Sequence, residues 1–146
     1  MDESIVVGTD GSETAKRAVT EAIRLARALG AELHVVSAYE PLRGVRIAGA
    51  PDGAAKVWAP LPDAHVVATL EEAAAAVRIG GVEVDTHAIE GDPADALLRV
   101  ASQVDAGMIV VGNQGMHGAK RVLGSVTNTV SHKARCNVLI VSTDLD

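Results

Sequence analysis

The feature that most constrains the fold is a regular alternation of two apolar patterns along the chain. Short runs rich in β-branched residues alternate with segments whose apolar residues recur every three or four positions. The first pattern is typical of buried strands and the second of amphipathic helices. The expected strands are residues 4–9, 32–38, 82–89, 107–112 and 137–143, and the expected helices carry apolar stripes over 15–29, 66–77, 97–104 and 126–134.

Strands that are joined by helices predict a parallel sheet with helices on both faces, because parallel neighbours need crossover connections. A chain of 146 residues, 48% of them hydrophobic, is sufficient for one such α/β domain. In a doubly wound, five-stranded sheet of order 3-2-1-4-5, ligands bind at the carboxyl ends of the first and fourth strands. We therefore expect the turns after residues 4–9 and 107–112 to lie side by side.

A glycine-rich stretch, GNQGMHGAKRVLGSV, starts at the end of the fourth expected strand. It combines glycines that let backbone amides approach an anion with a helix N-terminus and a hydroxyl at Ser125. An ordinary strand-to-helix turn with a capping serine has the same pattern, so the spacing alone leaves both interpretations open. The candidate phosphate ligands are Gly112, Gly115, Gly124 and Ser125, with added positive charge from Lys120 and Arg121.

No pattern in the sequence indicates catalysis or a metal site. The P-loop motif and the dinucleotide fingerprint are absent, and so is the G-x-S-x-G nucleophile motif. The five histidines show no metal-ligand spacing, and Cys136 is the single cysteine. His34 and His132 are interpreted as structural or solvated, and His117 as an exposed loop residue. We therefore expect ligand binding rather than turnover.

Charge and composition also limit the partners. A net charge of −6 and the near absence of aromatic residues argue against nucleic acid. No apolar run reaches the length of a membrane span, and the N-terminus is acidic where a secretory signal is basic. Together with the single Cys136, this predicts a protein of the reducing cytoplasm.

One segment, Glu40 to Pro62, has neither periodicity. It is rich in Gly, Ala and Pro. An insertion of this length in a compact domain is usually functional or disordered, so we expect a long flexible loop at 40–62 that acts as a mobile flap.

Three stretches together resemble the universal stress protein family: IVVGTDGSETAKRAV, GDPADALL, and GNQGMHGAKRVLGSVTNTV followed by CNVLIV. The resemblance covers residues 1–146 as one domain and implies the fold of the adenine nucleotide alpha-hydrolase-like proteins. It also implies an adenine nucleotide as ligand, ATP first and AMP or cyclic AMP as alternatives, with Mg or Mn accompanying a triphosphate. The family loop reads G-x2-G-x9-G-[ST], whereas eight residues separate Gly115 from Gly124 here.

The resemblance further implies a role for individual residues. Asp10 is placed beside the ribose or base, with a helix cap as the alternative, and the backbone of Ala38 is placed beside the adenine. Other expected members of the pocket are Gly8, Thr9 and Gly91 in its wall and the amides of Val126 and Thr127 at the phosphate.

For the protein as a whole, the resemblance implies a role in the stress response through ligand binding. It also implies a homodimer in which strand 137–143 pairs antiparallel with its copy. The alternatives are a slow ATP hydrolase and a nucleotide-free dimer that acts by association.

Overall fold

The computed structural model of the chain describes residues 3–40, 63–113 and 124–143. The flap expected at 40–62 lies outside the described residues except for Glu40. Residues 114–123 of the glycine-rich stretch, which include Gly115, His117, Lys120 and Arg121, also lie outside them.

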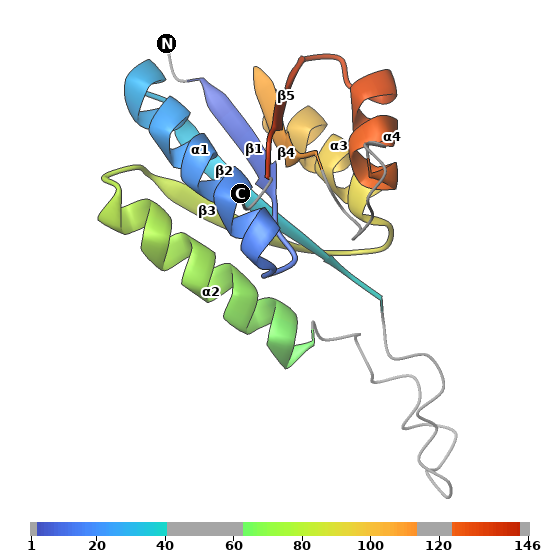
Figure 1. Cartoon of the computed structure of the whole chain (residues 1–146), viewed down its shortest axis with the longest axis horizontal. Coiled ribbons are helices and arrows are strands. Elements are labelled where there is room, and N and C mark those ends of the chain that lie inside the picture. Colours follow the sequence, from blue (N-terminus) through green and yellow to red (C-terminus); the bar gives the residue numbers. More distant parts are fainter. Residues whose placement is uncertain (1–2, 41–62, 114–123, 144–146) are drawn as a thin grey trace, which may run out of the picture.

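Strands and helices alternate through the described ranges, as the sequence predicts (Figure 1). Each pair of neighbouring strands is parallel, and the sheet order β3-β2-β1-β4-β5 confirms the doubly wound arrangement. The elements are β1 (Ser4–Gly8), α1 (Glu13–Leu29), β2 (Glu32–Tyr39), α2 (Ala64–Ile79), β3 (Val84–Glu90), α3 (Pro93–Gln103), β4 (Met108–Gly112), α4 (Ser125–Lys133) and β5 (Asn137–Val141).

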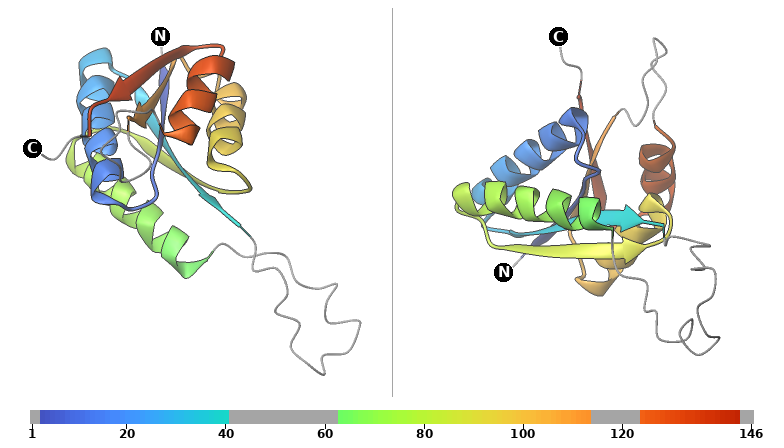
Figure 2. Two further views of the ribbon diagram at one scale, coloured as in Figure 1. Left: turned by 45° about the vertical axis from the view of Figure 1, so that its right-hand side comes forward. Right: turned by 90° about the horizontal axis from the view of Figure 1, so that it is seen from below.

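The sheet is covered on both faces, with α1 and α2 on one side and α3 and α4 on the other (Figure 2). In β1, Ile5 and Val7 belong to the first core and Val6 to the second. All three are at most 1% exposed. The double burial explains why the central strands read as continuous apolar runs rather than as an alternation. No helix within the described ranges is long and apolar enough to cross a bilayer.

Side chains cap α1 and α3, and the cap of α4 differs from the sequence prediction. Ser12 caps α1, and Asp92 caps α3 with Pro93 in the first turn. The expected cap at Ser125 is wrong: Gly124 is the N-cap residue of α4, and Ser125 is the exposed first helical residue. The reason is that the extended backbone of a cap occurs at Gly124, whose φ and ψ are −57° and 154°.

A chain of polar side chains crosses β1, β2 and β3 on the side of the sheet opposite α1 and α2. His34, which is 4% exposed, lies with Nδ1 2.9 Å from Nε2 of His87 and with Nε2 3.0 Å from Oε1 of Glu32. The same Glu32 oxygen accepts a hydrogen bond of 2.8 Å from Ser4 Oγ. These contacts make His34 a buried structural residue, one of the two roles that its position in the sequence left open.

Stability is expected to fall at mildly acidic pH because of His87. Burial, and then the charge of His34, lower the pKa of His87 in the folded protein. Below the ordinary histidine pKa of about 6.5, the unfolded chain therefore binds more protons than the folded one, and the free energy of unfolding decreases. Urea unfolding at pH 7 and pH 5.5 measures this decrease, which should be smaller in His87→Gln.

The matched control is His65→Gln, because His65 is exposed at the start of α2. This variant should keep the wild-type pH dependence. A His87→Gln protein that loses as much stability as the wild type between the two pH values would contradict the assignment. Hydrogen bonds with His34 and Ser4 also lower the pKa of Glu32. The stability that this adds is lost only at pH values below the ordinary pKa of a glutamate, a more acidic range.

Candidate functional site

A pocket opens at the carboxyl ends of β1 and β4, the position where the strand order reverses. This is the position predicted from the order 3-2-1-4-5. The described residues that line it are Gly8, Thr9, Asp10, Ser12, Thr14, Ala15, Ala18, Val36, Ala38, Pro93, Leu97, Val111, Gly112, Gly124, Val126 and Thr127.

The structure brings most of the candidate residues together at this pocket. Ser125 is exposed and is not among the lining residues, and neither is Gly91, whose amide donates to the carbonyl of Tyr39. Gly115 lies outside the described residues. The candidates that do line the pocket are Gly8, Thr9, Asp10, Ala38, Gly112, Gly124, Val126 and Thr127.

Two of the glycines allow neighbouring elements to approach closely. A Cβ atom on Gly8 would lie 3.2 Å from both Cδ atoms of Leu97, and one on Gly112 would lie 3.0 Å from Cγ2 of Thr143. Gly8 therefore lets α3 pack against the end of β1, and Gly112 lets the residues after β5 pack against the end of β4. Packing is thus a second reason for these glycines, beside the approach of an anion to the backbone.

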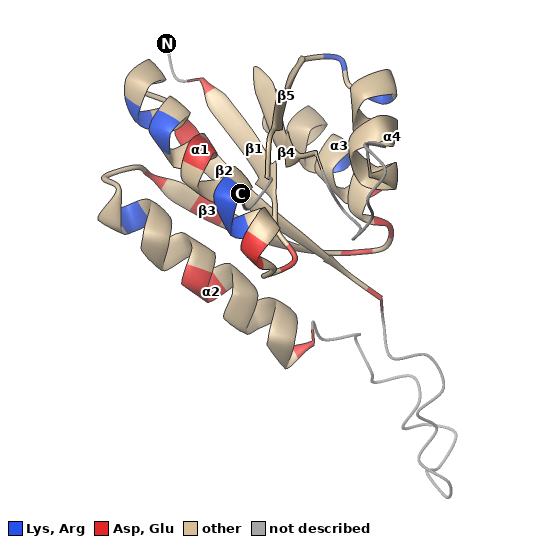
Figure 3. Cartoon of the chain, in the orientation of Figure 1, with Lys and Arg blue, Asp and Glu red and all other residues tan. Residues whose placement is uncertain are grey.

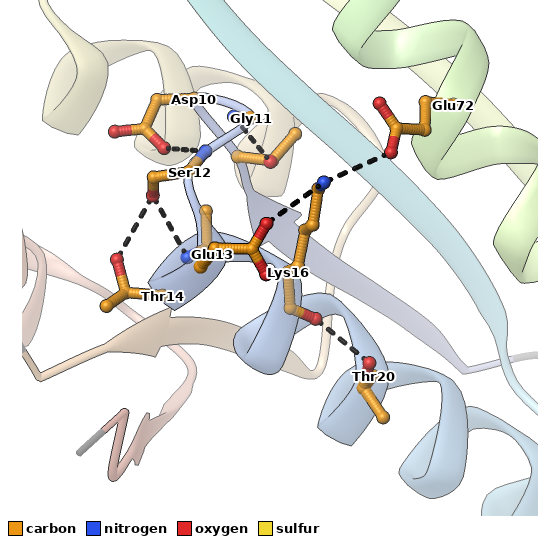
Figure 4. A network of polar contacts seen from close by, with 10 residues as sticks. Asp10, Gly11, Ser12, Glu13, Thr14, Lys16, Thr20 and Glu72 are labelled. Carbon is orange, nitrogen blue, oxygen red and sulfur yellow. Dashed lines mark hydrogen bonds and ion pairs between the residues drawn. The ribbon is translucent and has the colours of Figure 1, made fainter. Parts of the chain in front are cut away.

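The turn between β1 and α1 is held by short-range hydrogen bonds (Figure 4). Asp10 Oδ1 accepts from the amide of Ser12 at 2.9 Å, and Thr9 Oγ1 accepts from the amide of Gly11 at 3.1 Å. Ser12 Oγ accepts from the amide of Ala15 at 3.1 Å, so Ser12 is the cap of α1 and Asp10 is not. Asp10 is exposed at the pocket rim, and no hydrogen bond within the described ranges engages its Oδ2.

Among the described residues that line the pocket, Asp10 is the one with a charged side chain. Acidic segments lie in the turns after β1 and β3 (Figure 3), and no lysine or arginine is among the described lining residues. Lys16 of α1, shown in Figure 4, pairs with Glu72 of α2 at 3.2 Å and with Glu13 at 3.4 Å. These carboxylates, Glu72 first, raise the pKa of Lys16.

The first turn of α4 supplies the described amide donors of the pocket. The amides of Val126 and Thr127 have no partner inside the helix because they belong to its first turn. Thr127, which is 3% exposed, donates its hydroxyl to the carbonyl of Gly112. The partial positive charge of this helix end favours an anion at this place.

Apolar side chains form another part of the pocket lining, and this part was missing from the sequence prediction. It consists of Val36 from β2, Val111 from β4, and Pro93 and Leu97 from α3. Such an apolar slot next to amide donors suits a ligand with a flat ring and an anionic group. The one sequence signal that connected α3 with the pocket was the GDPADALL stretch of the resemblance, which contains Pro93 and Leu97.

No set of three or more His, Cys, Asp or Glu side chains in the described parts of the chain could hold a metal ion.

A profile of the Universal stress protein family matches residues 1–142. The chain belongs to the universal stress protein family.

Individual relatives agree with this assignment over almost the full length. A universal stress protein of Mycobacterium tuberculosis strain H37Rv is 39% identical, with 97% of both chains covered. A universal stress protein solved in complex with cAMP superposes with a TM-score of 0.76 at 34% identity, covering 98% of both chains. The universal stress protein from Archaeoglobus fulgidus in complex with dAMP gives a TM-score of 0.69 at 28% identity, covering 94% of this chain and 96% of that one.

Proposed function

We propose that this universal stress protein binds an adenine nucleotide, ATP first, in the pocket between β1 and β4. The observation that carries the proposal is the juxtaposition of an apolar slot with the amides of the α4 first turn, which have no partner inside the helix, at the topological switch point. The complexes of related structures with cAMP and dAMP support an adenine nucleotide, with AMP and cyclic AMP as the alternatives to ATP. The protein then acts in the stress response, in the cytoplasm, by binding rather than by turnover.

In this arrangement the adenine lies between Leu97 of α3 and the end of β2, where Ala38 offers backbone groups. The Asp10 carboxylate at the pocket rim accepts from the ribose, through the Oδ2 atom that the turn leaves unused. The phosphates lie against the amides of Val126 and Thr127, and Gly115 remains a predicted ligand. Mg²⁺ is usually bound by one or two carboxylates and by phosphate oxygens, and it keeps several of its waters. If Mg or Mn accompanies a triphosphate, Asp10 and the phosphate oxygens would therefore be its ligands.

Calorimetric titration with ATP, AMP and cyclic AMP, each with and without Mg²⁺, tests the proposal. A ligand at about 100 times its Kd should stabilise the fold by about 2.7 kcal/mol and raise the melting temperature measurably. Mass spectrometry of small molecules released from the fresh protein identifies a ligand that copurifies, and ADP formed during incubation with ATP would indicate the slow hydrolase. If none of the three ligands gives heat of binding or a shift in melting temperature, the proposal is contradicted.

The second proposal is a homodimer through the terminal strand. β5 is an edge of the sheet, and the side chains of Asn137 and Ile140 are exposed on it. An apolar edge strand offers unpaired backbone groups to a second copy, and a twofold axis would pair the two strands antiparallel. The strand itself is shorter than expected, Asn137–Val141 rather than 137–143.

Replacing Ile140 with lysine is expected to weaken the dimer. Ile140 is 37% exposed, and antiparallel pairing across a twofold axis brings the two introduced charges near each other. Such like charges should raise the dimer Kd at least about tenfold, as sedimentation velocity at micromolar protein would measure. Ile79→Lys on α2, where Ile79 is 88% exposed, is the matched control and should remain dimeric. A wild-type protein that sediments as a monomer would contradict the dimer itself.

A further inference from the structure

Asn113 is the residue that follows β4, at the base of the glycine-rich stretch. Its backbone amide donates to the carbonyl of Val141 in β5 at 2.9 Å. Its carbonyl accepts from the amide of Gly124, the N-cap residue of α4, at 3.3 Å. The backbone of one residue therefore joins the ends of β4 and β5 to the start of α4.

The side chain of Asn113 makes a further connection to the end of the chain. Its Oδ1 accepts two hydrogen bonds from Thr143, one from the backbone amide at 2.9 Å and one from Oγ1 at 2.7 Å. Thr143 is 1% exposed, and its Cγ2 occupies the space above Gly112. The chain thus leaves β5 after Val141 and is fixed to β4 by a side chain instead of by strand pairing.

The neighbouring Gly112 completes the junction. Its carbonyl accepts from the hydroxyl of Thr127, a residue of the α4 first turn that lines the pocket. Gly112 and Asn113 consequently hold the α4 N-terminus from two sides, at Gly124 and at Thr127. Because the Thr127 amide is one of the donors assigned to the phosphate, the position of these donors depends on this junction.

We propose that Asn113 is a positioning residue of the nucleotide site, and that its pair with Thr143 couples occupancy of that site to the segment that follows β5. The inference rests on the proposed nucleotide binding. An anion on the α4 amides holds this helix end against Gly112 and Asn113, and so slows the local opening that exposes the Thr143 amide. By reciprocity, loss of the Asn113 side chain loosens the helix end and weakens binding.

Amide hydrogen exchange and AMP titration of the whole protein test the coupling. In the wild type, saturating AMP should slow exchange of the Thr143 and Gly124 amides about tenfold, because an occupied site suppresses local opening. In Asn113→Ala both amides should exchange faster and respond no more than the amides of β3. The AMP Kd should rise about tenfold in this variant, the effect of one lost pair of hydrogen bonds.

Two further variants separate positioning from general damage. Thr143→Val keeps the shape and the amide donor but loses the hydroxyl, so it should raise the AMP Kd about threefold, a part of the Asn113→Ala effect. Ser131→Ala removes another side-chain to backbone hydrogen bond, from Ser131 Oγ to the Asn128 carbonyl on the exposed part of α4, and should change neither readout.

Each result has a distinct meaning. A wild type that does not bind AMP overturns the inference for AMP, and absence of ATP and cyclic AMP binding as well overturns the proposed function. Binding of AMP without any slowing at Thr143 overturns only the coupling. An Asn113→Ala protein that exchanges faster at Thr143 but keeps the wild-type Kd shows a structural role alone and overturns the positioning role.

Discussion

Replacing Ala38 with leucine is expected to abolish most nucleotide binding while the fold stays intact. Ala38 lies at the carboxyl end of β2 and lines the pocket next to Val36 and Leu97. Three added carbon atoms at this position fill the slot assigned to the adenine, and a clash of this kind should raise the nucleotide Kd about 100-fold. Calorimetric titration with the ligand that the wild type binds measures the change.

The matched control for this variant is Ala88→Leu. Ala88 lies on the neighbouring strand β3 but belongs to the core on the opposite face of the sheet. It receives the same change in volume outside the pocket, so its affinity should equal that of the wild type. Thermal melting should show that Ala38→Leu is folded. Unchanged affinity in folded Ala38→Leu would place the adenine elsewhere.

Replacing Leu97 with alanine should give the largest loss of stability among the pocket residues. Leu97 is 3% exposed in the core formed with α3 and α4, and both its methyl groups lie against Gly8. Removal of these atoms leaves a cavity between α3 and β1, and substitutions of this type lower the free energy of unfolding by about 3 kcal/mol. Urea unfolding followed by far-ultraviolet circular dichroism measures the loss.

Leu29→Ala provides the same chemical change at a different burial. Leu29 is the last residue of α1 and is 48% exposed, so its truncation should cost less than about 1 kcal/mol. Equal losses in the two variants would show that α3 does not pack on β1 as described. Because Leu97 also forms a wall of the pocket, Leu97→Ala should bind nucleotide more weakly than Leu29→Ala at a temperature where both are folded.

The parallel sheet could be predicted from the sequence because it depends on local patterns, and the place of the pocket follows from it once the doubly wound order 3-2-1-4-5 is taken as given. Strands such as Ser4–Gly8 and Met108–Gly112 are buried on both faces, so each appears as an uninterrupted apolar run. Helices between them require parallel pairing, and parallel pairing with a reversal of order creates the crevice. The turn that contains Asp10 follows β1 and the glycine-rich stretch starts at the end of β4, so the two meet at this crevice.

What the sequence did not show depends on register and on packing between distant elements. His87 reaches His34 because β2 and β3 pair with Val36 opposite His87, and no local pattern encodes this register. Leu97 enters the pocket because of the way α3 lies on the sheet. The last strand was predicted two residues too long, because Ser142 and Thr143 continue a strand-like composition while the hydrogen bonds of Thr143 go to Asn113.

The strand order also joins two stretches of chain at the centre of the sheet. The first stretch forms β1, β2 and β3, and the second forms β4 and β5. β1 pairs with β4 through Ile5–Met108, Val6–Ile109 and Val7–Val110, residues that are far apart in sequence, whereas β2 and β3 follow β1 with only helices and loops between. Pairing over such a separation closes a long loop and is expected to be slow in folding. In the proposed complex, a nucleotide would touch Asp10 on one side and Thr127 on the other and so would connect these two stretches. Its binding energy would then oppose their separation, and the ligand would act as a reversible cross-link formed after the chain has closed.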